Sequence, residues 1–156
     1  MSARILVVED RPDNQKLIAY LLGKFGYETR LADTGEQGVE IAQREDFDLV
    51  LCDIYLPGIS GYEVARRLKA DPRFQRVPVV AITALTRPAD RDRVLAAGFD
   101  GHVPKAIAPR EFLNHVQSFL ATGHSKLPEF DRHVLAAETQ DAELIASSNS
   151  KGIYYG

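Results

Sequence analysis

The chain has 156 residues, of which 45% are hydrophobic and 26% charged, and its formal net charge is −3. This length fits one domain with a modest extension, and the hydrophobic share excludes a chain that is disordered throughout. The nineteen basic and twenty-two acidic residues are well mixed, which gives no indication of a nucleic-acid surface. The apolar runs are too short for a membrane helix and residues 1–4 lack a signal-peptide pattern, so we expect a cytoplasmic protein.

Strand and helix patterns alternate along the chain. Continuous apolar runs such as residues 5–8 are typical of strands buried on both faces. Apolar residues then recur at helical spacing, and Gly26 and Gly98 are suited to end helices. The expected strands cover residues 5–8, 28–32, 49–52, 77–82 and 101–103. The expected helices begin at Pro12 and at the capping-box pair Thr34 and Gln37, and then cover residues 62–70, 87–97 and 109–120.

This order is a strand followed by a helix, five times, over residues 4–121. The connections are long enough to cross over, so the pattern predicts an α/β fold with a doubly wound parallel five-stranded sheet and helices on both faces. We expect one domain over residues 1–123. Residues 124–156 lack a strand-like core run and form no independent domain, although their pattern allows an amphipathic helix near residues 131–147.

Chemically capable side chains follow four of the five expected strands. Glu9 and Asp10 follow the first strand, Asp53 the third, Thr83 ends the fourth, and Lys105 comes after the fifth. Ligands of open α/β sheets bind outside the carboxyl ends of the strands. The sequence therefore predicts that three carboxylates, one hydroxyl and one amine converge at a single edge.

Three neighbouring carboxylates repel one another, and a hard divalent cation removes that repulsion. Oxygen ligands with room for water suit Mg²⁺, which neutralises the charge of a phosphoryl donor and of an attacking carboxylate. Lys105 could pair with a phosphoryl oxygen as a compact positive charge, and Thr83 could donate a hydrogen bond to another. A carboxylate nucleophile such as Asp53 can form an acyl phosphate.

These residues together resemble the signature of the response-regulator receiver domain, the CheY-like family, over about residues 3–122. The matching positions are Glu9-Asp10, Asp53 with Leu56-Pro57-Gly58 and Ser60-Gly61, Thr83-Ala84, and Lys105. The resemblance implies the flavodoxin/CheY-like sheet order 2-1-3-4-5.

It also implies a role for each residue. Asp53 would be phosphorylated by a sensor histidine kinase or a histidine phosphotransfer protein, and Lys105 would assist. Mg²⁺ would be bound by Asp10, Asp53 and the backbone carbonyl of Tyr55, with Glu9 acting through water. The protein would not be a turnover enzyme, because it would catalyse only its own phosphorylation and dephosphorylation.

The resemblance further implies a switch. Thr83 would move towards the phosphoryl group, and His102 stands where the family often has a switching aromatic residue. The face of the fourth helix, fifth strand and fifth helix would then change partners. We expect a downstream protein or a second copy of the chain to bind this face or the C-terminal extension.

Two departures from the family pattern concern the pocket. The family usually has proline after the lysine, whereas Ala106 follows Lys105 here and Pro104 precedes it, so the loop could have a different shape. Tyr55 is bulkier than many residues at this position. We hypothesise that Tyr55 slows the approach of water and lengthens the phosphorylated lifetime.

Structural alternatives remain open at this stage. Glu9 and Asp10 could cap the first helix, and Asp53 could be a turn residue of a loop. Thr83 could be a simple helix-entry hydroxyl, Lys105 a solvated lysine, and His102 a surface strand residue. The other histidines, His115, His124 and His133, lack metal-ligand spacing and are expected on the surface.

The main functional alternative is a constitutive interaction module that has the pocket but is never phosphorylated. The intact set of Asp10, Asp53, Thr83 and Lys105 argues against it. A dinucleotide-binding protein or a flavodoxin is excluded because the first turn, residues 9–12, is acidic instead of glycine-rich. A phosphatase of the haloacid dehalogenase type would need a second aspartate where Tyr55 stands.

Overall fold

The computed structural model describes residues 2–84, 88–105 and 107–123. Its elements are β1 (Arg4–Val8), α1 (Pro12–Lys24), β2 (Glu28–Ala32), α2 (Gly35–Arg44), β3 (Leu49–Asp53), α3 (Gly61–Lys69), the 3₁₀ helix η1 (Pro72–Phe74), β4 (Val79–Thr83), α4 (Pro88–Ala96), β5 (Gly101–Pro104) and α5 (Pro109–Gly123). All neighbouring strands pair in parallel, in the order β2-β1-β3-β4-β5. The predicted fold class and sheet order are therefore confirmed.

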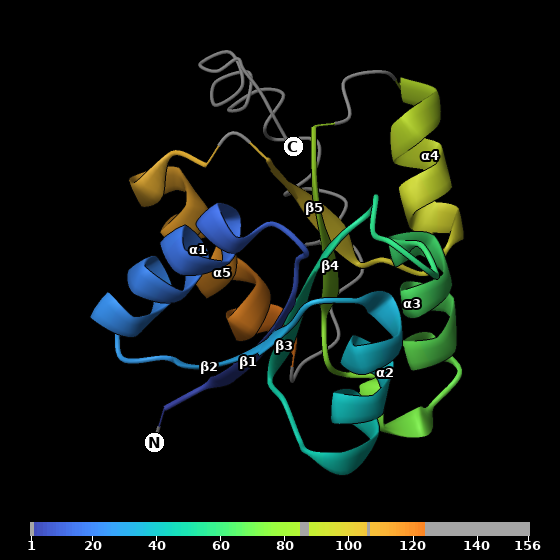
Figure 1. Cartoon of the computed structure of the whole chain (residues 1–156), viewed down its shortest axis with the longest axis horizontal. Helices are drawn as coiled ribbons and strands as arrows, with labels where there is room; N and C mark the ends of the chain where they lie inside the picture. Colours follow the sequence, from blue (N-terminus) through green and yellow to red (C-terminus); the bar gives the residue numbers. More distant parts are fainter. Residues whose placement is uncertain (1, 85–87, 106, 124–156) are drawn as a thin grey trace.

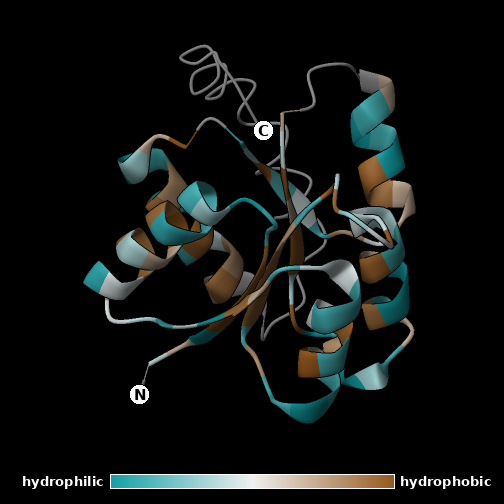
Figure 2. Ribbon diagram, viewed as in Figure 1, coloured by the Kyte–Doolittle hydropathy of each residue, from teal (hydrophilic) through white to brown (hydrophobic). Residues whose placement is uncertain are grey.

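The helices cover the sheet on both faces. Figure 1 shows α1 and α5 on one side and α2, α3 and α4 on the other. Because successive strand residues point to opposite faces, Ile5 and Val7 belong to the core under α1 and α5, and Leu6 and Val8 to the core under the other three helices. In Figure 2 the sheet is mostly hydrophobic, and the hydrophilic residues of the helices lie mainly on their outer sides. The strands are thus packed between two hydrophobic cores, which fix the positions of the strand ends.

The element boundaries follow local chemistry. Pro12 is the first residue of α1, as predicted, and Thr34 accepts the expected capping hydrogen bond from the Gln37 backbone N–H at 3.1 Å. The side chain of Gln37 does not return to Thr34, however, because its Oε1 accepts from the Asp33 backbone N–H at 2.7 Å. The second hydrogen bond of the capping box is therefore made by the N–H of Asp33, one residue before Thr34.

Most elements lie within one residue of their predicted ends, and two differ by more. β4 begins at Val79 instead of residue 77, since Pro78 has no N–H to donate to a strand ladder and contributes only a carbonyl, which accepts from Val50. α5 continues to Gly123, three residues beyond its predicted end. Arg87, where the fourth helix was expected to start, and the predicted helix near residues 131–147 lie outside the described residues. Within the described ranges, no helix is long and apolar enough to cross a membrane.

Candidate functional site

Three carboxylates meet at the carboxyl edge of the sheet. Glu9 and Asp10 follow β1 and Asp53 ends β3, and one oxygen from each lies within 4.8 Å of the others. Glu9 and Asp53 are buried, and Asp10 is half-buried. The arrangement agrees with the cluster expected from the sequence, since β1 and β3 are adjacent strands.

A single lysine reaches into this acidic cluster from the end of β5. Lys105 Nζ lies 2.5 Å from Asp53 Oδ2 and 3.8 Å from Glu9 Oε1. The backbone N–H of Lys105 donates to the carbonyl of Thr83 at 2.8 Å, so the same residue ties the ends of β4 and β5 together. Thr83 itself is 2% exposed. The structure thus brings Lys105 and both buried carboxylates together, and places Thr83 on the neighbouring strand.

Burial disfavours the charged form of Glu9. It is fully buried, and its Oε2 accepts from the Arg11 backbone N–H at 3.0 Å, whereas its Oε1 has no hydrogen-bond donor among the described residues. Burial raises the pKa of Glu9, and the nearby Asp53 charge acts in the same direction, although the Arg11 hydrogen bond and Lys105 oppose it. A buried carboxylate oxygen without a donor, beside two further carboxylates, fits a hard divalent cation that takes oxygen ligands.

The loop after Asp53 is held by close backbone contacts. The Gly61 N–H donates to the Ile54 carbonyl at 2.7 Å, and a side chain at Gly61 would overlap with the backbone of Asp53 and Ile54. Ser60 caps α3 by accepting from the Glu63 backbone N–H at 3.3 Å. The glycine following Ser60 therefore lets α3 begin directly against the strand end that carries Asp53.

A glutamate of α2 holds the middle of the same loop. Glu36 Oε2 accepts from the Ile59 backbone N–H at 3.1 Å. Gly58 has a φ of 79°, a conformation that favours glycine, and a side chain there would also meet the Glu36 carboxylate. Sequence reasoning noted Gly58 but missed Glu36, because no local pattern links residues 23 positions apart.

A glutamine supports the acidic cluster from α1. Gln15 Nε2 lies 2.5 Å from the Glu9 carbonyl and 2.7 Å from Asp33 Oδ1, and it donates to both. This amide joins the loop after β1 to the loop after β2. Sequence reasoning missed Gln15 too, since a polar residue on the first turn of a helix usually faces solvent.

The two other predicted site residues, Tyr55 and His102, differ in their burial. The Tyr55 backbone N–H donates to Asp53 Oδ1 at 3.4 Å, while its side chain is 68% exposed. His102 is buried in β5, which argues against its interpretation as a surface strand residue. Burial, with smaller contributions from His115 and Arg91, lowers the pKa of His102 to about 3, so its imidazole is neutral near pH 7.

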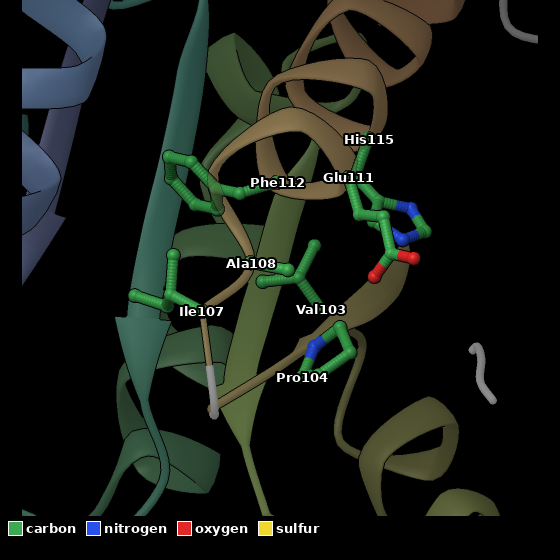
Figure 3. Close-up of a pocket in the computed structure, with 7 residues that line it drawn as sticks. All are labelled: Val103, Pro104, Ile107, Ala108, Glu111, Phe112 and His115. Carbon is green, nitrogen blue, oxygen red and sulfur yellow. The ribbon is translucent and has the colours of Figure 1, made fainter. Parts of the chain in front are cut away.

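A separate small pocket lies between the end of β5 and the first turns of α5. It is lined by Val103, Pro104, Ile107, Ala108, Glu111, Phe112 and His115, and none of the predicted site residues borders it. Figure 3 shows Ile107 and Phe112 on one side of this pocket and Glu111 with His115 on the other. The expectation that His115 is a surface group is wrong: it is half-buried, and burial lowers its pKa to about 4. Apolar residues of β5 and of α5, Val103 and Phe112, line the same pocket as His115.

Comparison with known proteins yields one family and a consistent set of relatives. The family model described as "Response regulator receiver domain" matches residues 5–117. The polar-differentiation response regulator DivK of Brucella ovis is 34% identical over 120 residues, which are 77% of this chain and 98% of that protein.

Solved structures agree with this assignment. The receiver domain of the sensor histidine kinase PA1611 from Pseudomonas aeruginosa, solved with a magnesium ion coordinated in its active-site cleft, has a TM-score of 0.72 and 34% identity over 78% of this chain and 99% of that one. The chemotaxis response regulator CheY4 of Vibrio cholerae, at 24% identity, has the same fold with a TM-score of 0.74 over 76% of this chain and 99% of that one.

Proposed function

The chain belongs to the response regulator receiver domain family of two-component signalling, and we propose that Asp53 is its phosphoacceptor. The observation that carries this proposal is the ion pair of 2.5 Å between Lys105 Nζ and Asp53 Oδ2. An almost fully buried carboxylate that faces an ammonium group at the carboxyl edge of a parallel sheet is placed to react with a phosphoryl group.

In the proposed step, an oxygen of Asp53 attacks the phosphorus atom of a phosphohistidine. The new O–P bond forms as the P–N bond breaks, and the electron pair of that bond returns to the imidazole of the donor. Lys105 then forms an ion pair with a phosphoryl oxygen, since its ammonium already lies beside the Asp53 oxygen that would carry the phosphoryl group. The Thr83 hydroxyl, on the adjacent strand, is the donor to a second oxygen.

Mg²⁺ is the cofactor that the donor set fits, and Asp10, Asp53 and the Tyr55 carbonyl would bind it, with Glu9 acting through water. The ion would supply positive charge that offsets the repulsion between the carboxylates and an incoming phosphoryl group. The buried Glu9 Oε1 without a hydrogen-bond donor supports this assignment, as does the magnesium ion in the cleft of the PA1611 receiver domain.

The donor would be a sensor histidine kinase or a histidine phosphotransfer protein, and the output a change of protein partner. We place the output at the face of α4, β5 and α5. His102 supports this choice, because it is buried in β5, the strand that pairs with β4 beside Thr83. Because β5 contacts both α4 and α5, a movement of Thr83 at the end of β4 and of His102 in β5 would reach both helices, and we assign the switch to these two residues.

The remaining assignments follow from the proposed reaction. Residues 1–123 would act as the receiver, and residues 124–156 as an extension without its own core. The protein would catalyse only its own phosphorylation and dephosphorylation, in the cytoplasm where a kinase domain can reach it. No observation on the described residues favours the constitutive interaction module over this function.

The test is phosphorylation by acetyl phosphate with MgCl₂, read on a phosphate-affinity gel. The wild-type chain should give a shifted band that disappears with EDTA and in Asp53→Asn. Asp46→Asn is the matched control, because the Asp46 side chain is 95% exposed and away from the pocket, and it should shift like the wild type. No shifted wild-type band would favour the constitutive module, and a shift that persists in Asp53→Asn would place the phosphoryl group elsewhere.

A further inference from the structure

The outer side of α1 exposes more apolar surface than a solvated helix face requires. Leu17 is 39% exposed, Tyr20 61% and Phe25, just after the helix, 51%. They account for three of the six large hydrophobic residues exposed in the described ranges, whereas the other three lie on β2, the β3–α3 loop and α4. We call these three residues, with Lys16 and Lys24, the α1 face. Grouped exposed apolar side chains of this kind indicate an interaction surface.

The α1 face is also positively charged. Lys24 Nζ lies 5.4 Å from the centre of the Tyr20 ring, and within the described part of the chain neither Lys16 nor Lys24 forms an ion pair. The charged residues at the start of the helix offset each other, since Arg11 pairs with Asp13 at 3.6 Å. An acidic and apolar partner would therefore complement this face.

The chain itself continues from a point beside this face. α1 and α5 are in contact, and Figure 1 shows them next to each other on one side of the sheet. Both helices return the chain from the carboxyl edge to the amino edge of parallel strands, so they run in the same direction. The last described residue, Gly123, thus lies at the end of the molecule where α1 also ends, and another 33 residues follow it.

The composition of the extension matches the α1 face. Between residues 129 and 145, apolar side chains recur at helical spacing at Phe130, Val134, Ala137, Leu144 and Ile145, and Asp141 lies on the same side of such a helix. The same segment has a net charge of −4, from five carboxylates and one arginine. As a helix, these 17 residues would be about 25 Å long, which is close to the roughly 20 Å of α1. Residues 124–128, extended, would span about 16 Å, enough to turn the chain back along α1.

We propose that residues 129–145 fold back as an amphipathic helix on the α1 face of the same chain. The apolar stripe of the segment covers Leu17, Tyr20 and Phe25, and its carboxylates face Lys16 and Lys24.

A spin label on the extension tests this proposal in the full chain. Ser147→Cys carries the nitroxide, because the only native cysteine, Cys52, is fully buried beside the pocket. We expect loss of most of the amide signal of α1 residues 16–25 in NMR spectra, with the signals of α3 and α4, on the opposite face of the sheet, retained.

Two variants of the labelled chain provide the comparison. Leu17→Glu/Tyr20→Glu should restore the α1 signals, because it places charge where the apolar stripe docks, and both side chains are too exposed to be required for folding. Leu95→Glu is the matched control, since Leu95 is an exposed apolar residue (47%) on α4, and it should leave the α1 signals broadened.

Three results would overturn the proposal. One is α1 signals that stay sharp in the labelled wild-type chain, and another is broadening that survives Leu17→Glu/Tyr20→Glu. The third comes from mixing spin-labelled chain at natural isotope abundance with ¹⁵N-labelled, unlabelled chain. Broadening of α1 in that mixture would assign the α1 face to a second copy instead of the same chain.

Discussion

Carboxylates are paired with arginines at one edge of the sheet and are grouped together at the other. At the edge where the strands begin, Arg4 pairs with Glu28 at 3.1 Å and with Glu45 at 2.8 Å, and Arg30 also pairs with Glu45. The hydrogen bond from Arg4, followed by that from Arg30, lowers the pKa of Glu45. At the edge where the strands end, by contrast, burial raises the pKa of Glu9.

The difference shows what each edge does. Ion pairs at the amino edge join β1, β2 and the residue after α2, and they match two arginines with two carboxylates. Three carboxylates at the carboxyl edge face one lysine, so electrostatic repulsion remains in the folded chain. A cation or a covalent modification can relieve that repulsion, which couples binding at this edge to the stability of the whole domain.

The largest expected effect comes from closing the space beside Asp53. Gly61→Ala places a methyl group on the backbone of Asp53 and Ile54, and neither strand end nor helix start can move without breaking the Gly61–Ile54 hydrogen bond. We expect a loss of about 3 kcal/mol in the free energy of unfolding, measured by urea denaturation.

Gly23→Ala is the matched substitution away from the carboxyl edge. Gly23 lies in α1 with nothing within 4 Å of the new methyl group, so the variant should be as stable as the wild type or more stable by about 0.5–1 kcal/mol. Equal losses in the two variants would contradict the close approach at Gly61.

Removing one buried charge should stabilise the carboxyl edge. Glu9→Gln keeps the shape of the side chain and deletes the charge that burial disfavours, so its melting temperature without metal should exceed that of the wild type by a few degrees. The gain in melting temperature on adding MgCl₂ should be smaller than in the wild type.

The opposite result is expected at the amino edge. Glu28→Gln removes a paired and exposed carboxylate, and should lower the melting temperature slightly without changing the response to MgCl₂. A wild-type chain that is as stable as Glu9→Gln without metal would show that repulsion at the carboxyl edge is already compensated.

A rate at the carboxyl edge gives a finer test. Tyr55→Asn should speed loss of the phosphoryl group from Asp53 several-fold, which corresponds to less than about 1.4 kcal/mol in the barrier. The effect is modest because Tyr55 is largely exposed, so its ring restricts the path of water only in part if the hypothesis holds. Phosphorylated protein followed over time on the affinity gel provides the rate. Tyr55→Phe, which retains the ring, should behave as the wild type, and an unchanged rate in Tyr55→Asn would remove Tyr55 as a barrier to water.

The smallest effect is expected from the best-paired residue of the amino edge. Arg4→Ala should cost no more than about 1 kcal/mol at pH 7, because the pairs it loses are largely in contact with water. Since the pKa of Glu45 is lowered in the folded chain, its contribution is present above pH 4.5 and is lost as the pH falls below that value. Urea denaturation at pH 7 and pH 3.5 should therefore show the gap between Arg4→Ala and the wild type narrowing in acid.

Much of the fold was predictable because its signals are local. Apolar runs predicted β1, β3 and β4, and the alternation of strand and helix patterns placed the mixed strand β2 and the short strand β5. Pro12, Gly26 and Gly98 marked helix ends that the structure confirms. The meeting of Glu9, Asp10 and Asp53 was predictable as well, since the carboxyl ends of parallel strands share one edge.

What the sequence did not predict depends on contacts between distant segments. Gln15 and Glu36 hold the loops around the cluster through single hydrogen bonds to residues of other elements, and no spacing rule indicates such partners. The burial of His115 was missed for a similar reason, because the pocket that it lines also includes Val103 and Pro104 of β5, a separate element. The amino-edge ion pairs of Arg4 likewise join segments more than 20 residues apart.

The burial of β3 has a mechanical consequence. All five of its residues are buried, and it pairs with β1 up to Cys52 on one side and with β4 up to Asp53 on the other. The backbone that carries Asp53 is therefore held in place by the sheet. A group added to the Asp53 side chain has to be accommodated by movement of the surrounding loops and not of the strand. The part of the domain that moves is therefore set before any partner binds.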